Sequence, residues 1–181
     1  MALTTLDIKE PGLNTLPPGV ERYIVEGGGL TGIQIFPDDE IEIINNEGNQ
    51  ICEISVFNKD GKSELAILGL KEIKDNSEIK KILFKKDETS LQALLQLKKR
   101  NLNIEKSKSS LVFDKETKAG ESIKLKSKDK CYCIIAAQGN EMMVHEQNPS
   151  TELTVMIKRS VVKKDKEFSI IPDPVYDPSN E

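Results

Sequence analysis

Four residues have side chains that could together hold a zinc ion, namely Cys52, Cys131, Cys133 and His145. Cys131 and Cys133 lie two positions apart on a predicted strand, which places both thiols on the same face. Zinc sites usually take paired cysteines from turns with two to four residues between them, and no such pair is present. Buried cysteines that act as small apolar side chains are the other interpretation. We therefore expect no cofactor, and keep zinc held by Cys131, Cys133 and His145 as the alternative.

The residues that serve in acid–base catalysis form no recognisable set. His145 is the only histidine, which limits proton transfer near neutral pH. No nucleophile lies in the sequence context of a known triad. The acids Glu26, Asp39, Glu40 and Glu53 lie on or beside predicted strands, at alternating positions that usually face solvent. The sequence therefore predicts no catalytic residue.

The run Gly27-Gly28-Gly29 suggests a phosphate-binding loop. The Lys-Ser or Lys-Thr pair that such loops require does not follow, and neither does a predicted helix. Glycines between two strands more often form a bulge or a bend, and we expect that role here.

Composition excludes two classes of partner. Charged residues make up 31% of the 181 residues, the net charge is −4, and the charges are interspersed, so no basic surface is predicted to bind nucleic acid. No apolar run approaches the ~20 residues of a membrane span. The N-terminus lacks the features of a signal peptide. Because three cysteines is an odd number, we expect reduced thiols in the cytoplasm. Self-association into a homo-oligomer is a separate expectation.

The central prediction for the fold is a hairpin over residues 38–58. Glu40 and Glu42 alternate with isoleucines, which indicates a half-buried strand. The Asn-Asn-Glu-Gly sequence at residues 45–48 predicts the turn. Residues 51–57 are almost continuously apolar, which is typical of a strand buried on both faces.

Other strands are predicted over residues 21–26, 30–36, 111–113, 122–126, 131–137 and 152–159. A short helix ending at Gly69 is predicted within residues 62–70. Two helices follow between residues 76 and 101, the first capped by Ser77 and the second by Asp87 or Thr89. The second should bury a stripe of four leucines, at positions 91, 94, 95 and 97.

Strands, then helices, then strands indicate a mainly β (α+β) domain, an antiparallel barrel or sandwich with a helical insert around residues 76–101. We expect an extended lead-in over residues 1–20 and one domain over residues 21–163, with an insert over residues 62–101. Residues 164–181 are rich in proline and should form a tail or linker.

Several motifs resemble the N-terminal part of the urea carboxylase-associated domain family. The matching stretches are Pro17-Pro18-Gly19, Gly27-Gly28-Gly29, residues 37–43 and residues 46–53. The family's acidic-Gly-x-Gln turn, with an acid and an Asn after it, corresponds to Glu47, Gly48, Gln50, Glu53 and Asn58. Residues 147–153 and 157–159 resemble the closing strand of a subset that precedes a folate-dependent aminomethyltransferase module, similar to the glycine-cleavage T-protein.

This resemblance implies a non-catalytic accessory or docking domain of one-carbon or amine metabolism, with an aminomethyltransferase-type partner. Metal-binding members of the family carry a Cys/His set in their second half, which Cys131, Cys133 and His145 do not match. A metal-dependent hydrolase or deiminase of small nitrogen compounds is one alternative. The other is a small-ligand binding module, in which a pocket is lined by Gln50, Glu53, Asn58 and Gln147.

Overall fold

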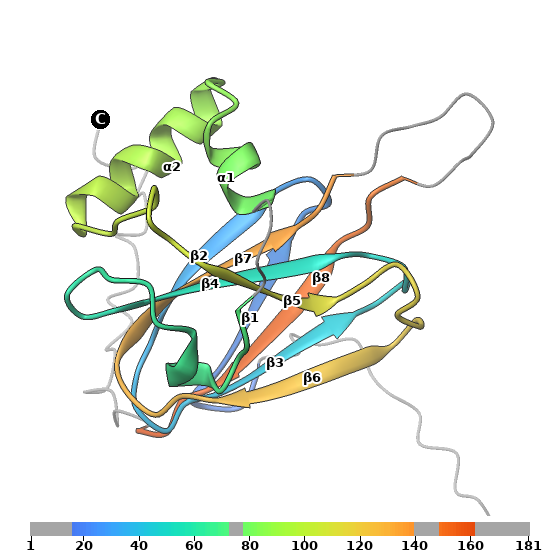
Figure 1. Ribbon diagram of the computed structural model, residues 1–181. Coiled ribbons are helices and arrows are strands. Elements are labelled where there is room, and N and C mark those ends of the chain that lie inside the picture. Colours follow the sequence, from blue (N-terminus) through green and yellow to red (C-terminus); the bar gives the residue numbers. More distant parts are fainter. Residues whose placement is uncertain (1–15, 73–77, 140–148, 162–181) are drawn as a thin grey trace, which may run out of the picture.

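The structure, a computed structural model, describes residues 16–72, 78–139 and 149–161 (Figure 1). In these ranges the chain forms eight strands and three helices. The strands are β1 (Val20–Val25), β2 (Leu30–Ile35), β3 (Glu40–Asn45), β4 (Cys52–Asn58), β5 (Ser109–Phe113), β6 (Glu121–Lys126), β7 (Cys131–Ala137) and β8 (Leu153–Lys158). The helices are the 3₁₀ helix η1 (Leu65–Leu68), α1 (Glu78–Leu83) and α2 (Glu88–Lys99).

The strands form two antiparallel sheets of four, packed face to face. One sheet has the order β1-β8-β3-β6 and the other the order β2-β7-β4-β5. The pairing is nested, since the first strand pairs with the eighth, the second with the seventh, the third with the sixth and the fourth with the fifth. This is the strand order of a jelly roll. The predicted β-rich fold is confirmed, and it is a sandwich rather than a closed barrel.

The main core lies between the two sheets, where alternate side chains of every strand meet. On β3, Ile41 and Ile43 are buried in this core while Glu40 is exposed, as the alternation predicts. On β4, Cys52, Ile54 and Val56 face the same core.

A second core covers the opposite face of the β2-β7-β4-β5 sheet. Phe57 and Ile134 point outward from that sheet and pack against Ile79 and Leu83 of α1. β4 is therefore buried by a sheet on one side and by helices on the other, which confirms the prediction from its continuous apolar run.

The predicted hairpin over residues 38–58 is wrong, although both of its strands exist. β3 pairs with β6 and β8 in one sheet, whereas β4 pairs with β5 and β7 in the other. The Asn-Glu-Gly turn therefore carries the chain across the sandwich. The alternation in β3 specifies which side chains are buried, but it does not specify which strand is the neighbour.

The helical insert is confirmed, with one correction. Asp87 is the N-cap of α2 and accepts a hydrogen bond from the Ser90 N–H at 2.7 Å, and Gly69 ends η1 in a left-handed conformation. Only half of the predicted leucine stripe is covered, because Leu91 and Leu95 are 50% and 58% exposed. Leu94 and Leu97 pack on the second core, so α2 touches the rest of the molecule along a narrow face.

Some predictions lie outside the described residues. These are the Ser77 cap, most of the extended lead-in and the proline-rich tail. No helix among the described residues is long and apolar enough to cross a membrane.

Candidate functional site

All three cysteines lie between the sheets, in the main core. Cys131 and Cys133 do share a face of β7, but that face is fully packed. Burial raises the pKa of Cys131 to about 11 and also raises the pKa of Cys52 and Cys133 above the ordinary thiol value. Because a metal binds the thiolate, these thiols are poor ligands as placed.

The histidine of the zinc alternative, His145, lies outside the described residues. Among the residues that are described, no three His, Cys, Asp or Glu side chains come together as a metal-binding group. The zinc alternative therefore stays a prediction without a visible ligand set.

Gln50 was predicted to line a ligand pocket, and it is instead a buried brace. Its amide nitrogen donates to the Gln138 carbonyl at 2.8 Å, and its Oε1 accepts from the Thr151 N–H at 2.7 Å. The Asn45 amide in turn donates to the Gln50 carbonyl at 2.9 Å. Gln50 thus holds together the two chain segments that follow β7 and precede β8.

Two buried oxygens beside this brace have no partner among the described residues, Asn45 Oδ1 and Thr151 Oγ1. Buried polar atoms of this kind are usually satisfied by an ordered water. They mark a polar interior at this end of the sandwich.

Glu53 and Asn58 also differ from the predicted role. Glu53 is 2% exposed on the helix-covered face, and its Oε2 accepts from the Glu78 N–H at the start of α1 at 2.6 Å. Asn58 forms a turn, because its Oδ1 accepts from the N–H groups of Asp60 and Lys62. Gln147 lies outside the described residues. Gln50, Glu53 and Asn58 therefore do not line one pocket.

The glycine run bends the chain from one sheet to the other, as predicted. A Cβ on Gly27 would lie 2.6 Å from the Ser150 carbonyl carbon. The Gly28 and Gly29 N–H groups donate to the carbonyls of Ala137 and Glu26, both at 2.9 Å. These N–H groups are already used, so they do not form a phosphate cradle.

A charged network at the opposite end of the sandwich was not predicted. Asp39 is fully buried and binds the Arg159 guanidinium at 2.7 Å, and Arg159 also binds both carboxylate oxygens of Glu21. The Arg159 guanidinium lies 5.7 Å from the centre of the Phe36 ring. Asp39 and Arg159 are 120 residues apart in sequence, so no local pattern could have paired them.

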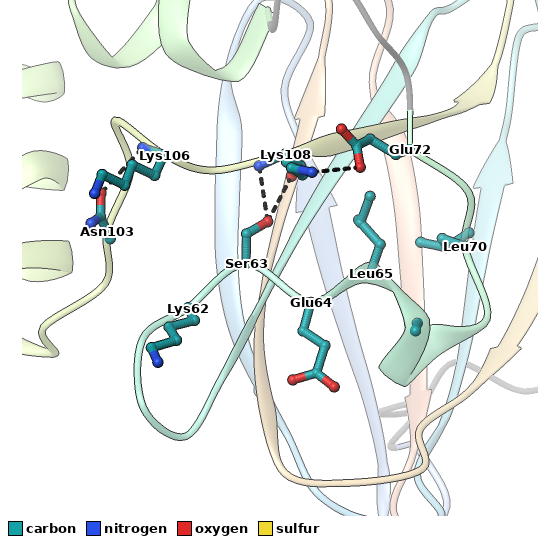
Figure 2. A pocket seen from close by; sticks show the side chains of 10 residues that line it. Lys62, Ser63, Glu64, Leu65, Leu70, Glu72, Asn103, Lys106 and Lys108 are labelled. Carbon is teal, nitrogen blue, oxygen red and sulfur yellow. Dashed lines mark hydrogen bonds and ion pairs between the residues drawn. The ribbon is translucent and has the colours of Figure 1, made fainter.

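A pocket with a volume of about 600 Å³ lies beside η1 (Figure 2). It is lined by Lys62, Ser63, Glu64, Leu65, Ala66, Leu70, Glu72, Asn103, Lys106 and Lys108. Lys108 pairs with Glu72 at 2.9 Å, and its backbone N–H donates to Ser63 Oγ. Lys62 and Lys106 have no ion-pair partner in the part of the chain that the structure describes. We call this the η1 pocket.

Comparison with known proteins gives one informative relative. The chain is 34% identical, over 172 residues, to a protein of Ruegeria pomeroyi named trimethylamine-oxide aldolase. The alignment covers 94% of this chain and 22% of the relative. No protein-family model matches the chain. No solved structure matches it either.

This relative corrects the function expected from the sequence. A protein that aligns with almost the whole chain is named as an enzyme, so the expected non-catalytic docking domain of an aminomethyltransferase-type enzyme is wrong. The resemblance to the urea carboxylase-associated family stays a prediction, because no family model matches.

Proposed function

We propose that this chain is part of an enzyme that acts on trimethylamine oxide or a closely related methylated amine oxide. The observation that carries the proposal is the 34% identity to the trimethylamine-oxide aldolase over 94% of the chain. The chain spans 22% of that relative's length, so the activity in the relative's name is a proposal for this chain.

The η1 pocket supports a site for such a substrate. An amine oxide joins an oxygen that carries negative charge to a group of methyls. The ammonium groups of Lys62 and Lys106 can donate hydrogen bonds to the oxygen, and Leu65 and Leu70, on the other side of Ser63 in Figure 2, offer apolar surface for the methyls. The pocket is larger than this substrate, so water or another part of the enzyme would share it.

An aldolase-type cleavage of trimethylamine oxide balances without an external oxidant. One methyl carbon leaves with the oxygen as formaldehyde, and the remaining atoms form dimethylamine. The N–O bond and one C–N bond break, a C–O bond forms, and a proton moves from the methyl to nitrogen. Carbon is oxidised and nitrogen is reduced within the same molecule.

The test is to incubate the purified chain with trimethylamine oxide and to measure both products. The chain is assayed as prepared and after loading with Zn²⁺ or Fe²⁺. Equal amounts of formaldehyde and dimethylamine support the proposal. Absence of both products, together with absence of trimethylamine oxide binding by calorimetry, would contradict it.

A paired substitution tests the pocket separately from the function. Lys62→Met with Lys106→Met should lower turnover at least tenfold, because both donors to the oxygen are removed. Lys115→Met, on the exposed turn between β5 and β6, is the matched control. Unchanged turnover in the double variant would show that the substrate binds outside the η1 pocket, and the proposed activity would still stand.

Binding is better measured by calorimetry than by thermal shift. Trimethylamine oxide is excluded from protein surfaces and stabilises folded proteins without binding them. A ligand with five non-hydrogen atoms gains at most about 7.5 kcal/mol, so a dissociation constant of micromolar order is the tightest expected. Titrations should therefore extend into the millimolar range.

The remaining expectations are proposals of the same kind. All three cysteines are free thiols, which supports the cytoplasm as the compartment. The aminomethyltransferase-type partner rests on the sequence resemblance alone, and the zinc alternative rests on the residue types of Cys131, Cys133 and His145.

A further inference from the structure

A groove runs between α2 and the outer face of the β2-β7-β4-β5 sheet, and it shares no lining residue with the η1 pocket. Its cavity has a volume of about 390 Å³ and is lined by Leu30, Gly32, Ile33, Gln34, Ala93, Gln96, Leu97, Arg100, Leu102, Tyr132, Cys133 and Ile134. We call it the α2 groove. Most of its lining is apolar, as in small-molecule sites of this size.

Gly32 opens the α2 groove. Its neighbours in β2, Ile33 and Ile35, alternate into the main core, so residue 32 faces outward under α2. A Cβ added to Gly32 would meet nothing within 4 Å. A glycine inside a strand weakens it and often marks close approach of a ligand or another backbone. Since no backbone approaches Gly32, the space fits a ligand.

Arg100 gives the groove its charge. Among the described residues that line it, Arg100 alone is charged. Only its Nη1 is occupied, by the Gln96 carbonyl and Oε1, both at 3.1 Å. The other guanidinium N–H groups have no partner in the described part of the chain, and Lys98 and Lys99 precede Arg100 in the last turn of α2. This end of the groove favours an anion.

The groove continues beneath the first half of α2. A second cavity of about 420 Å³ shares Leu30 and Ala93 with it. The far end of this cavity carries Glu26 and Asp87 beside a single lysine, Lys85. An anionic group therefore belongs at the Arg100 end, and an apolar chain belongs between the two ends.

From this arrangement we propose that the α2 groove binds an amphipathic carboxylate, with its apolar chain beneath α2 and its carboxylate on Arg100. The ligand class is that of medium-chain fatty acids. This site is independent of the proposed amine-oxide chemistry and can exist without it.

The test compares three probes with the same eight-carbon chain, octanoate, octan-1-ol and octylamine, by calorimetry with the wild-type chain. Octanoate should bind at least tenfold more tightly than octylamine, because only the carboxylate complements Arg100. Octan-1-ol should fall between them. Equal affinities for octanoate and octylamine would overturn the proposal.

Two variants locate the site. Arg100→Gln should weaken octanoate at least tenfold and leave octan-1-ol unchanged, whereas Lys115→Gln should change neither. Gly32→Leu should abolish binding of all three probes by filling the groove. Octanoate binding that survives either Arg100→Gln or a folded Gly32→Leu chain would place the ligand elsewhere.

Discussion

At the scale of single residues, Arg159 is the clearest case in which one side chain joins distant parts of the chain. It binds Glu21 of β1, the Gln34 carbonyl of β2 and Asp39 before β3. Asp39 also accepts hydrogen bonds from the Phe36 and Ser160 N–H groups at 2.9 Å. The buried carboxylate is thus compensated by one cation and two backbone donors.

Arg159→Met should lower the free energy of unfolding by about 3 kcal/mol, because it leaves the Asp39 charge buried without its cation. Urea denaturation followed by circular dichroism measures this. Arg22→Met, at an exposed position of β1, is the matched control and should change stability by less than about 0.5 kcal/mol. Equal losses in the two variants would show that the Arg159 network contributes nothing specific.

The same network predicts a pH dependence. Burial raises the pKa of Asp39, but hydrogen bonds from Ser160, Phe36 and Arg159 outweigh it, so this pKa is lowered overall. Arg159 also lowers the pKa of Glu21. Stability from both acids is therefore complete above their unfolded pKa values of about 4 and is lost as pH falls through the lower folded values. Wild type should lose stability more steeply than Arg159→Met below about pH 4.

Residue roles were the least predictable feature from sequence. Gln50, Glu53 and Asn58 were predicted to line a ligand pocket, and each forms a separate structural contact. Asp39 was grouped with acids at positions that usually face solvent, yet it is fully buried. A side chain's partner depends on which distant segment folds beside it, and local sequence patterns do not specify that segment.

At the scale of elements, the glycine turn after β3 shows how closely two connections pack. Gly48 has a φ of +79°, and a Cβ there would lie 2.6 Å from the Ala119 nitrogen. Gly120 has the same φ of +79°, but a Cβ there would meet nothing within 4 Å. The two positions therefore separate backbone strain from steric overlap.

Gly120→Ala should cost about 1 kcal/mol, which is the strain of a left-handed alanine. Gly48→Ala should cost more, about 2–4 kcal/mol, because the turn must also move away from Ala119. Chemical denaturation of both variants gives the comparison. If Gly48→Ala cost no more than Gly120→Ala, the close approach of the two turns would not contribute to stability.

Gly32→Leu is expected to have the opposite effect on stability. Gly32 is in a strand interior, has no positive φ, and has open space above it. A leucine there reduces the entropy of the unfolded chain and buries apolar surface against α2. The free energy of unfolding should therefore rise by about 0.5–1 kcal/mol. Gly120→Ala again serves as the control. A loss of stability would mean that α2 lies closer to β2 than described.

The positions of the strands and helices were far more predictable from sequence than the pairing and packing of these elements. The strand boundaries and the Asp87 cap follow from local patterns that a few residues contain. The pairing of β3 was mispredicted because a short turn usually joins adjacent strands, whereas in a jelly roll it crosses between sheets. Leu91 and Leu95 fit a helical stripe but remain exposed, because α2 rests on the sheet along one narrow face.

At the scale of the whole molecule, the three cysteines report on the opening of the sandwich. Cys52 and Cys133 come from neighbouring strands of one sheet, and all three thiols face the opposite sheet. None can react with a reagent in solution unless the sheets separate. With a pKa of about 11, even Cys131 would be thiolate in only about one molecule in a thousand at pH 8.

We expect no rapid reaction of native protein with a thiol reagent such as 5,5′-dithiobis(2-nitrobenzoate). Three thiols per chain should react after denaturation, and in mild denaturant the slow rate should follow the unfolding rate measured by circular dichroism. Added Zn²⁺ should leave that rate unchanged, since the thiols are packed in the core. A thiol that reacts at once and is protected by Zn²⁺ would show that Cys131 or Cys133 faces solvent, and would restore the zinc alternative. Because the thiols become accessible when the sheets separate, the thiol reaction should also be faster in Arg159→Met and Gly48→Ala, in line with their expected losses of stability.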